Sequence, residues 1–326
     1  MLKILIFYII YIALGNTENT RHVPPANVGV PVPKSSHRFD TVFYPAHLLK
    51  KYEAAGMDIT AMKVANTMEG HTGFARGIQT ATEWNIETNE GKIALPFAFE
   101  ASFPSQADVE GHMRAMEKDL GCFDFIKVET SDLATTTHAH GILFLYGNVS
   151  GGGCWSAVGI VPGFTGGLGS ITQWGAPSQW QVISLDTSCA GLEAGTVMHE
   201  VMHALGFSHE HNRPDRDNYL TYVEENTNHA DQYFKLSDSE WIDSGSKFEL
   251  ESVMTYCSQC SSNGNGPVMV VTATGAEFED GPRMTTTDAL QIQWRYCRER
   301  TEFSAKDVTT CTSTDTLGFT RDVFTD

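Results

Sequence analysis

The stretch "HEVMHALGFSHEHNRPDRD", residues 199–217, gathers four histidines in one short segment and decides how the rest of the sequence is interpreted. His199 and His203 are four residues apart, so on a helix their imidazoles leave the same face and can reach one metal ion. Gly206 favours the left-handed turn that ends many helices, after which the reversed chain can present His209. The spacing therefore predicts a metal site built from three histidines.

The residues around the first two histidines predict a buried helix. This segment is apolar on nearly every side, through Val197, Met198, Val201, Met202 and Leu205. The alternative is a pair of core histidines satisfied by backbone carbonyls. Burying histidines without partners is costly, whereas zinc satisfies them, and the extended spacing is far more specific than two histidines alone. The pattern therefore favours a metal ion.

Three protein nitrogens leave one position open on a zinc ion, which is typical of a catalytic site rather than a structural one. Glu200 lies between the first two histidines, where a carboxylate can take a proton from water and return it to a leaving amine. A structural zinc site is the alternative, but no fourth Cys or His follows at an obvious spacing. We expect hydrolysis of amide bonds in protein or peptide substrates.

The start of the chain predicts export. Residues 1–15, "MLKILIFYIIYIALG", combine a basic residue with a short apolar run and small residues near the end, as in a secretory signal peptide. The run is too short for a membrane anchor, so we expect a secreted, extracellular protein. The net charge of −18 argues against a nucleic-acid partner, which needs a basic surface.

The seven cysteines all lie between positions 122 and 311, and the expected export favours disulfides. A proline-rich, cysteine-free stretch predicts a prosegment over residues 16–76, followed by a globular domain over 77–297 and a polar tail over 298–326. The helices are expected over 105–121, with Ser105 and Asp108 as capping residues, over the histidine segment, and over 285–296, with Leu290 and Trp294 prominent in its apolar face. The strands are expected at 92–100, 123–129, 141–147, 156–161 and 180–186.

A wider resemblance emerges from these residues. The stretch 199–217 is similar, at every fixed position, to the pattern HExxHxxGFxHExxRxDRD of the astacin family of secreted zinc endopeptidases. "ESVMTYC", residues 251–257, resembles the Met-turn of metzincin peptidases, in which Met254 would form an apolar floor beneath the zinc. The resemblance covers about residues 77–297. It implies an α+β, metzincin-like catalytic domain of two subdomains: a twisted, mostly N-terminal β-sheet with the zinc helix, then an irregular part that ends in a helix.

The resemblance also implies roles for single residues. His199, His203 and His209 would bind one zinc ion, and Glu200 would be the general base and acid. Tyr256 would be a further zinc ligand that swings away to hydrogen-bond the oxyanion. Glu210 would pair with the N-terminus of the activated enzyme.

Latency is expected to depend on the prosegment. The family's prosegments place an aspartate on the zinc, and the nearest match here is Asp58 in "AAGMDI". A cysteine switch is excluded because residues 1–121 contain no cysteine. An activating protease is expected to cut after Arg76 and free the amine of Gly77.

The remaining expectations concern cysteines, specificity and a glycan. The resemblance implies disulfides between Cys122 and Cys297 and between Cys154 and Cys189. The other three cysteines leave two arrangements open: Cys257 bridges to Cys260, or one of these two pairs with Cys311. Arg283 is similar in place to a basic residue that favours Asp or Glu after the scissile bond in some relatives. "NVS" at Asn148 is an acceptor site for a glycan.

A second class of function fits the same scaffold. A catalytically silent, secreted binding protein would use the substrate cleft without turnover, and it would most simply lose the base while keeping the metal ligands. Because Glu200, the three histidines and Tyr256 are all present, the sequence favours an active endopeptidase made as a zymogen.

Overall fold

The computed structural model describes residues 84, 88, 90–147, 153–189, 191–237, 241 and 244–297. The chain divides into two compact units, Met1–Ser35 and Ser36–Asp326, and every described residue lies in the second. The expected signal peptide, prosegment and polar tail lie outside the described residues. Among the helices of the described residues, none has the length and apolar character needed to cross a bilayer.

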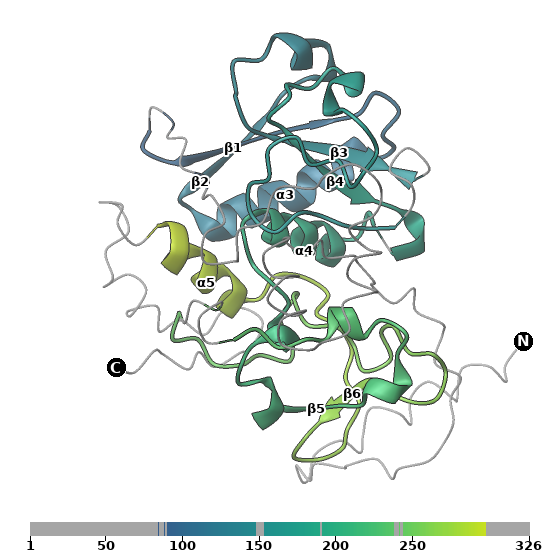
Figure 1. Cartoon of the computed structure of the whole chain (residues 1–326). Coiled ribbons are helices and arrows are strands. Elements are labelled where there is room, and N and C mark those ends of the chain that lie inside the picture. Colours follow the sequence, from purple (N-terminus) through teal and green to yellow (C-terminus); the bar gives the residue numbers. More distant parts are fainter. Residues whose placement is uncertain are drawn as a thin grey trace, which may run out of the picture. The chain divides into compact units, whose positions relative to one another are not determined.

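Four parallel strands form the main sheet, in the order β2-β1-β3-β4 (Figure 1). Their bounds are β1 Ile93–Phe99, β2 Phe123–Lys127, β3 Ile142–Tyr146 and β4 Gln181–Leu185. All residues of β1 and β4 are buried, as expected for strands that are covered on both faces and therefore consist of near-continuous apolar runs. These strands agree with the predicted ranges.

The predicted strand at 156–161 is wrong. This segment is a loop with a single bridge residue, Ile160, and Trp155, just before it, makes an isolated bridge to Ser184 of β4. Gly159 adopts a φ of 78°, which interrupts an extended backbone. The Val161 amide donates to the side chain of Gln181 instead of a neighbouring strand. The apolar composition of residues 156–161 therefore resembles that of a strand, although the backbone turns at Gly159.

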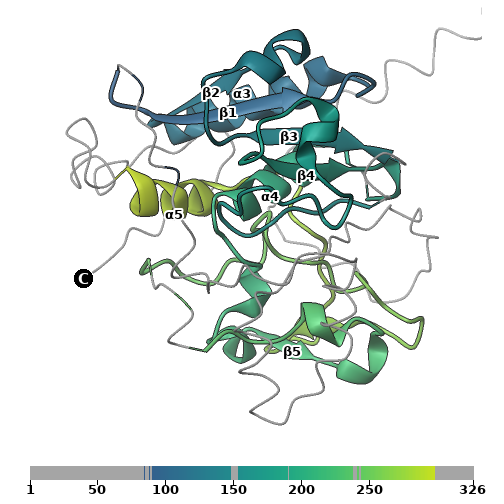
Figure 2. The same ribbon diagram turned by 45° about the horizontal axis from the view of Figure 1, so that its top comes forward.

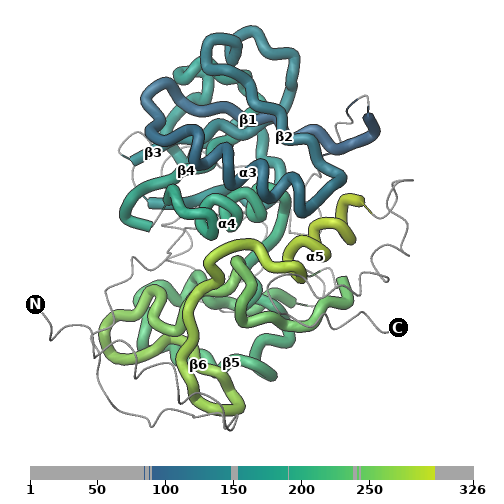
Figure 3. Tube along the Cα trace, turned by 180° about the vertical axis from the view of Figure 1, so that it is seen from behind, coloured from purple at the N-terminus to yellow at the C-terminus, as the bar shows by residue number. Residues whose placement is uncertain are grey.

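Helices α3 and α4 pack against each other and against the sheet, and α5 packs against α3 (Figures 1 and 3). Their bounds are α3 Gln106–Leu120, α4 Ala194–Ala204 and α5 Thr286–Tyr296. The predicted apolar stripe of α3 is buried, through Val109, Met113, Met116 and Leu120. Ser105 occupies the N-cap position and Asp108 the first turn, but the predicted capping by the Ser105 side chain is wrong, because its φ is 49° and it makes no capping hydrogen bond.

Helix α5 begins with a capping box. Thr285 accepts a hydrogen bond from the Asp288 amide, and the Asp288 carboxylate accepts one from the Thr285 amide. The same carboxylate accepts from Ser252 Oγ at 2.6 Å and from the Val253 amide at 3.0 Å. The predicted apolar face is shifted: Leu290 and Trp294 are half-buried, and the buried residues are Asp288, Ala289, Ile292 and Tyr296. Asp288 therefore joins the start of α5 to the Met-turn.

The segment between α4 and α5 is mostly irregular, as predicted, but it contains a small sheet that the sequence analysis missed. Strands β5 Leu220–Tyr222 and β6 Met269–Val271 pair antiparallel (Figure 2 labels β5). Short 3-10 helices occur at Thr130–Thr135, Ile171–Trp174, Thr187–Cys189, Glu210–Asn212, Arg216–Asn218, Glu224–Asn226 and Ala230–Gln232. The whole arrangement agrees with the predicted α+β class.

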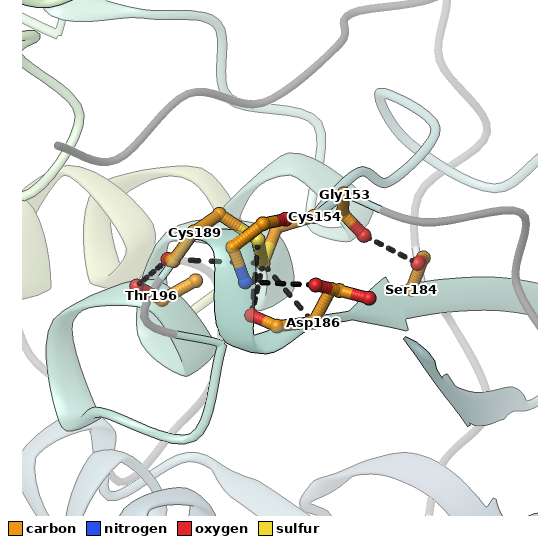
Figure 4. Close-up of a disulfide and its surroundings, with 7 residues drawn as sticks. Gly153, Cys154, Ser184, Asp186, Cys189 and Thr196 are labelled. Carbon is orange, nitrogen blue, oxygen red and sulfur yellow. Dashed lines mark hydrogen bonds between the residues drawn. A yellow bond between two sulfur atoms is a disulfide. The ribbon is translucent and has the colours of Figure 1, made fainter. Parts of the chain in front are cut away.

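Three disulfides lie among the described residues: Cys122–Cys297, Cys154–Cys189 and Cys257–Cys260. Figure 4 shows the second of these, which joins the loop before Trp155 to the 3-10 helix after β4. Ser184 Oγ donates to the carbonyl of Gly153 at 2.7 Å and Thr196 Oγ1 donates to that of Cys189 at 3.2 Å, which ties this loop to the sheet and to α4. Cys311 lies outside the described residues.

Candidate metal centre and active site

Helix α4 carries the first two predicted ligands in the interior. Every residue from Gly195 to Ala204 is buried, and His199, Glu200 and His203 have no exposed surface. The helix ends at Ala204, and Gly206, two residues further on, has a φ of 92° and gives the expected left-handed turn. A Cβ at Gly206 would also lie 3.1 Å from the guanidinium of Arg295, so glycine adopts this reversal with the least strain.

The three histidines converge. His199 Nε2 lies 3.1 Å from His203 Nε2 and 3.3 Å from His209 Nε2. In two of the rings the opposite nitrogen faces a carbonyl, with His199 Nδ1 2.7 Å from Val253 O and His203 Nδ1 2.7 Å from Phe207 O. A carbonyl only accepts, so Nδ1 carries the proton in both rings and the Nε2 lone pairs point to the common centre.

This donor set fits a zinc ion. Tetrahedral zinc at about 2.0–2.1 Å from each nitrogen requires ligand nitrogens about 3.3 Å apart, and the two separations measured from His199 Nε2 are 3.1 and 3.3 Å. The His–carbonyl contacts are the outer partners that orient metal-bound imidazoles. In the part of the chain that the structure describes, these three residues form the one cluster of His, Cys, Asp and Glu with the geometry of a metal site.

The Met-turn lies against the histidines. Met254 is buried in the same core cluster as residues of α4, and its carbonyl accepts a hydrogen bond from the Glu210 amide at 2.9 Å. The Tyr256 ring lies 4.4 Å from the ring of His209 and 6.4 Å from that of His199. Tyr256 is only 1% exposed, and its ring therefore lies buried beside the rings of two predicted ligands.

A buried carboxylate follows the third histidine. Glu210 Oε1 accepts from Arg213 Nη1 at 3.0 Å and from the Glu249 amide at 3.2 Å. Burial raises the pKa of Glu210 to about 7, against the lowering effect of the Arg213 charge. A cavity of about 60 Å³ adjoins this carboxylate. Its lining includes His209, Glu210, Arg213, Ser246, Gln291 and Arg295.

Two residues near the site were not assigned a role in the sequence analysis. Trp84 is buried, and its Nε1–H donates to the carbonyl of Ala204, the last residue of α4, at 2.9 Å. His211 is also fully buried and stacks on His209, with ring centroids 4.7 Å apart. Its position two residues after the third predicted ligand was the one available signal, but sequence spacing outside a helix does not predict ring contacts.

The other predicted residues are placed elsewhere or lie outside the described residues. Arg283 Nη2 lies 3.7 Å from Asp119 Oδ2, and both side chains are largely exposed. Asp58, Arg76, Gly77 and Asn148 lie outside the described residues.

Comparison with known proteins identifies the chain's relatives. The family model described as "Astacin", a peptidase family, matches residues 79–297, which is more than half of the chain. The zinc metalloproteinase nas-27 of Caenorhabditis elegans is 31% identical over 218 residues, covering 64% of this chain and 44% of that protein. The zinc metalloproteinase nas-7 of the same organism is 32% identical over 130 residues, covering 39% of this chain and 34% of that protein. The chain therefore spans less than half the length of these relatives.

One solved structure shows the fold. High choriolytic enzyme 1, a hatching enzyme zinc-protease from Oryzias latipes (Medaka fish), superposes with a TM-score of 0.51 at 21% identity. The match covers 66% of this chain and 94% of that chain. The α+β architecture built around the histidine helix is therefore shared with a zinc protease.

The fit of the three histidines to zinc predicts a metal-dependent stability. Adding Zn²⁺ to the metal-free protein should raise the free energy of unfolding, by about 4 kcal/mol at a thousandfold excess over the dissociation constant. His203→Ala should lose most of this increment, which is measured by thermal melting with zinc and with a chelator. The exposed His229 provides the control, since His229→Ala should keep the full increment. An equal response of both variants would contradict the predicted site.

Proposed function

This chain belongs to the astacin family of peptidases, and from that membership we propose that it is an endopeptidase that hydrolyses internal peptide bonds of proteins with one zinc ion as cofactor. The observation that carries the proposal is the convergence of three imidazole nitrogens, two of them from the buried helix that also carries Glu200. A binding protein would not need Glu200, a carboxylate buried on the same helix between two of the histidines.

The chain's own residues supply the proton transfers. Zinc, when bound by the three histidines, acts as a Lewis acid and lowers the pKa of water towards about 7. Glu200 accepts the proton of the attacking water and later passes it to the leaving amine. The phenol of Tyr256 donates a hydrogen bond to the oxygen on which negative charge develops, so its stabilising effect is greatest in the transition state.

The proposal includes export and synthesis as a zymogen. The apolar start of the sequence supports a signal peptide over residues 1–15, and the three disulfides suit an oxidising, extracellular compartment. Asn148 would then be open to glycosylation. Residues 16–76 form the prosegment, and a separate protease cuts after Arg76.

Activation places a new amine near Glu210. Trp84 donates a hydrogen bond to the carbonyl of Ala204, the last residue of α4. Gly206, two residues after Ala204, lines the cavity beside Glu210. Gly77 lies seven residues before Trp84, and seven extended residues reach about 23 Å. The freed amine of Gly77 can therefore reach the cavity, where a buried carboxylate gains from a cationic partner.

The role of Glu200 predicts a separation of metal binding from turnover. Glu200→Gln should keep zinc but lower the rate of peptide hydrolysis at least 100-fold, because the amide cannot accept the proton of water. Zinc content and casein hydrolysis are measured on the same activated protein. Glu193→Gln is the matched control, because Glu193 is exposed at the start of α4 and its side chain makes no capping bond. Near wild-type hydrolysis by the Glu200 variant would show that another group is the base.

The proposed latency predicts a gain of activity in an uncut proenzyme. With cleavage blocked by Arg76→Ala, the additional change Asp58→Ala should release hydrolysis, because the carboxylate that blocks the zinc is removed. Asp40→Ala in the same background is the control, since Asp40 is the other aspartate of the prosegment. If the Asp58 variant binds zinc but stays as inactive as the control, the prosegment inhibits by filling the cleft instead.

The proposed specificity is a preference for Asp or Glu after the scissile bond, supplied by Arg283. Profiling on a peptide library should show that Arg283→Ala loses this preference several-fold. Asp119→Ala should keep it, because the change removes the carboxylate 3.7 Å from Arg283 without removing the guanidinium. An unchanged acidic preference in Arg283→Ala would exclude the residue from recognition.

A further inference from the structure

His211 lies at the centre of the aromatic groups around the metal site. It belongs to the 3-10 helix Glu210–Asn212, directly after the third ligand, and it has no exposed surface. Its ring is nearly parallel to that of His209, with centroids 4.7 Å apart and an interplanar angle of 14°. It also lies 4.7 Å from the ring of Tyr256 and 5.2 Å from that of Tyr233.

Both ring nitrogens of His211 have backbone partners. The amide of Tyr256 donates to Nδ1 at 3.3 Å, and Nε2 lies 3.2 Å from the carbonyl of Gln232. An amide only donates and a carbonyl only accepts, so the proton of this imidazole is on Nε2. The ring is therefore a rigid bridge between the main chain of Tyr256 and the loop at Gln232.

The backbone amide of Tyr256 donates to an acceptor outside its own loop, unlike the amides of the residues on either side. The Thr255 amide donates to Ser252 O at 3.0 Å and the Cys257 amide to Cys260 Sγ at 3.1 Å, both within the same loop. The acceptor for Tyr256 is instead a side chain on the segment that carries His209. This contact links the main chain of the tyrosine to the third metal ligand.

We infer that His211 is a positioning residue for Tyr256: by accepting the Tyr256 amide on Nδ1, it fixes the main-chain point from which the phenol reaches the reacting carbonyl oxygen. The inference rests on the proposed function, in which the phenol acts in the transition state. A donor displaced by about 1 Å can cost about 100-fold in rate, so a fixed main chain matters more for turnover than for substrate binding.

Two substitutions separate the two hydrogen bonds of His211. In His211→Asn the side-chain oxygen can take the place of Nδ1, which keeps the acceptor for Tyr256 and loses the donor to Gln232. In His211→Gln the side-chain NH₂ can take the place of Nε2, which keeps the donor and loses the acceptor. Both variants lose the stacked imidazole, so stacking on His209 is removed equally.

The kinetic test compares these variants in zinc-loaded, activated enzyme. His211→Gln should lower kcat at least tenfold with KM within about twofold and with full zinc content, and His211→Asn should recover most of that loss. In a Tyr256→Phe background the further effect of His211→Gln should vanish, because the hydroxyl that it positions is gone. His112→Gln is the matched control: His112 Nε2 lies 3.2 Å from the carbonyl of Leu192, and this change should leave kcat unaltered.

A second readout does not depend on activity. Hydrogen exchange at the Tyr256 amide should be at least tenfold faster in His211→Gln than in wild type or in His211→Asn, with or without zinc. Equal kcat in the two His211 variants, a loss that persists in Tyr256→Phe, or equal exchange at Tyr256 would each overturn the inference. If wild type hydrolyses no peptide, the proposed function fails, and the exchange comparison still decides whether His211 holds Tyr256.

Discussion

The Nε2 atoms of His203 and His209 lie 3.1 and 3.3 Å from that of His199, and unprotonated nitrogens this close repel one another unless a cation lies between them. The domain is arranged to hold the three rings in this position. His199 is turned by the carbonyl of Val253 and His203 by that of Phe207, so the ring orientations depend on two loops outside α4. Val253 is in turn held by Asp288 at the start of α5. The positions of the histidine rings therefore depend on the order of these loops.

The residues after the third ligand are as important for the fold as for chemistry. The Arg213 guanidinium bonds to Glu210 and to both oxygens of Asp215, and Arg216 donates to the carbonyl of Tyr233. Glu210 and the two arginines are nearly fully buried, where loss of one partner leaves an uncompensated charge. These side chains hold the backbone of a segment that has almost no regular secondary structure in one conformation. In this segment, buried ion pairs provide the order that apolar packing provides in the sheet.

The sequence predicted the features that depend on local spacing. Helix α4, the reversal at Gly206 just after it and the convergence of the three histidines all follow from the spacing of His199, His203, Gly206 and His209, which are four, three and three residues apart. The carbonyl acceptors of those rings could not be predicted, because a backbone oxygen has no signature in the sequence. Strands β5 and β6 are three residues long, too short to show alternation, and the apolar segment at 156–161 resembled a strand because a positive φ at Gly159 is not visible in composition.

The Cys122–Cys297 disulfide joins residues 175 positions apart, and it bears on autolysis, to which any peptidase is exposed among copies of itself. A single cut anywhere between these cysteines yields two pieces that stay in one covalent molecule. The pieces then meet at the high effective concentration of a tethered pair, so the nicked domain keeps its strands and helices together. Cuts outside this span release only chain that lies beyond the bond. The disulfide thus keeps the domain in one molecule after a single cut between Cys122 and Cys297, the span that contains the three histidines.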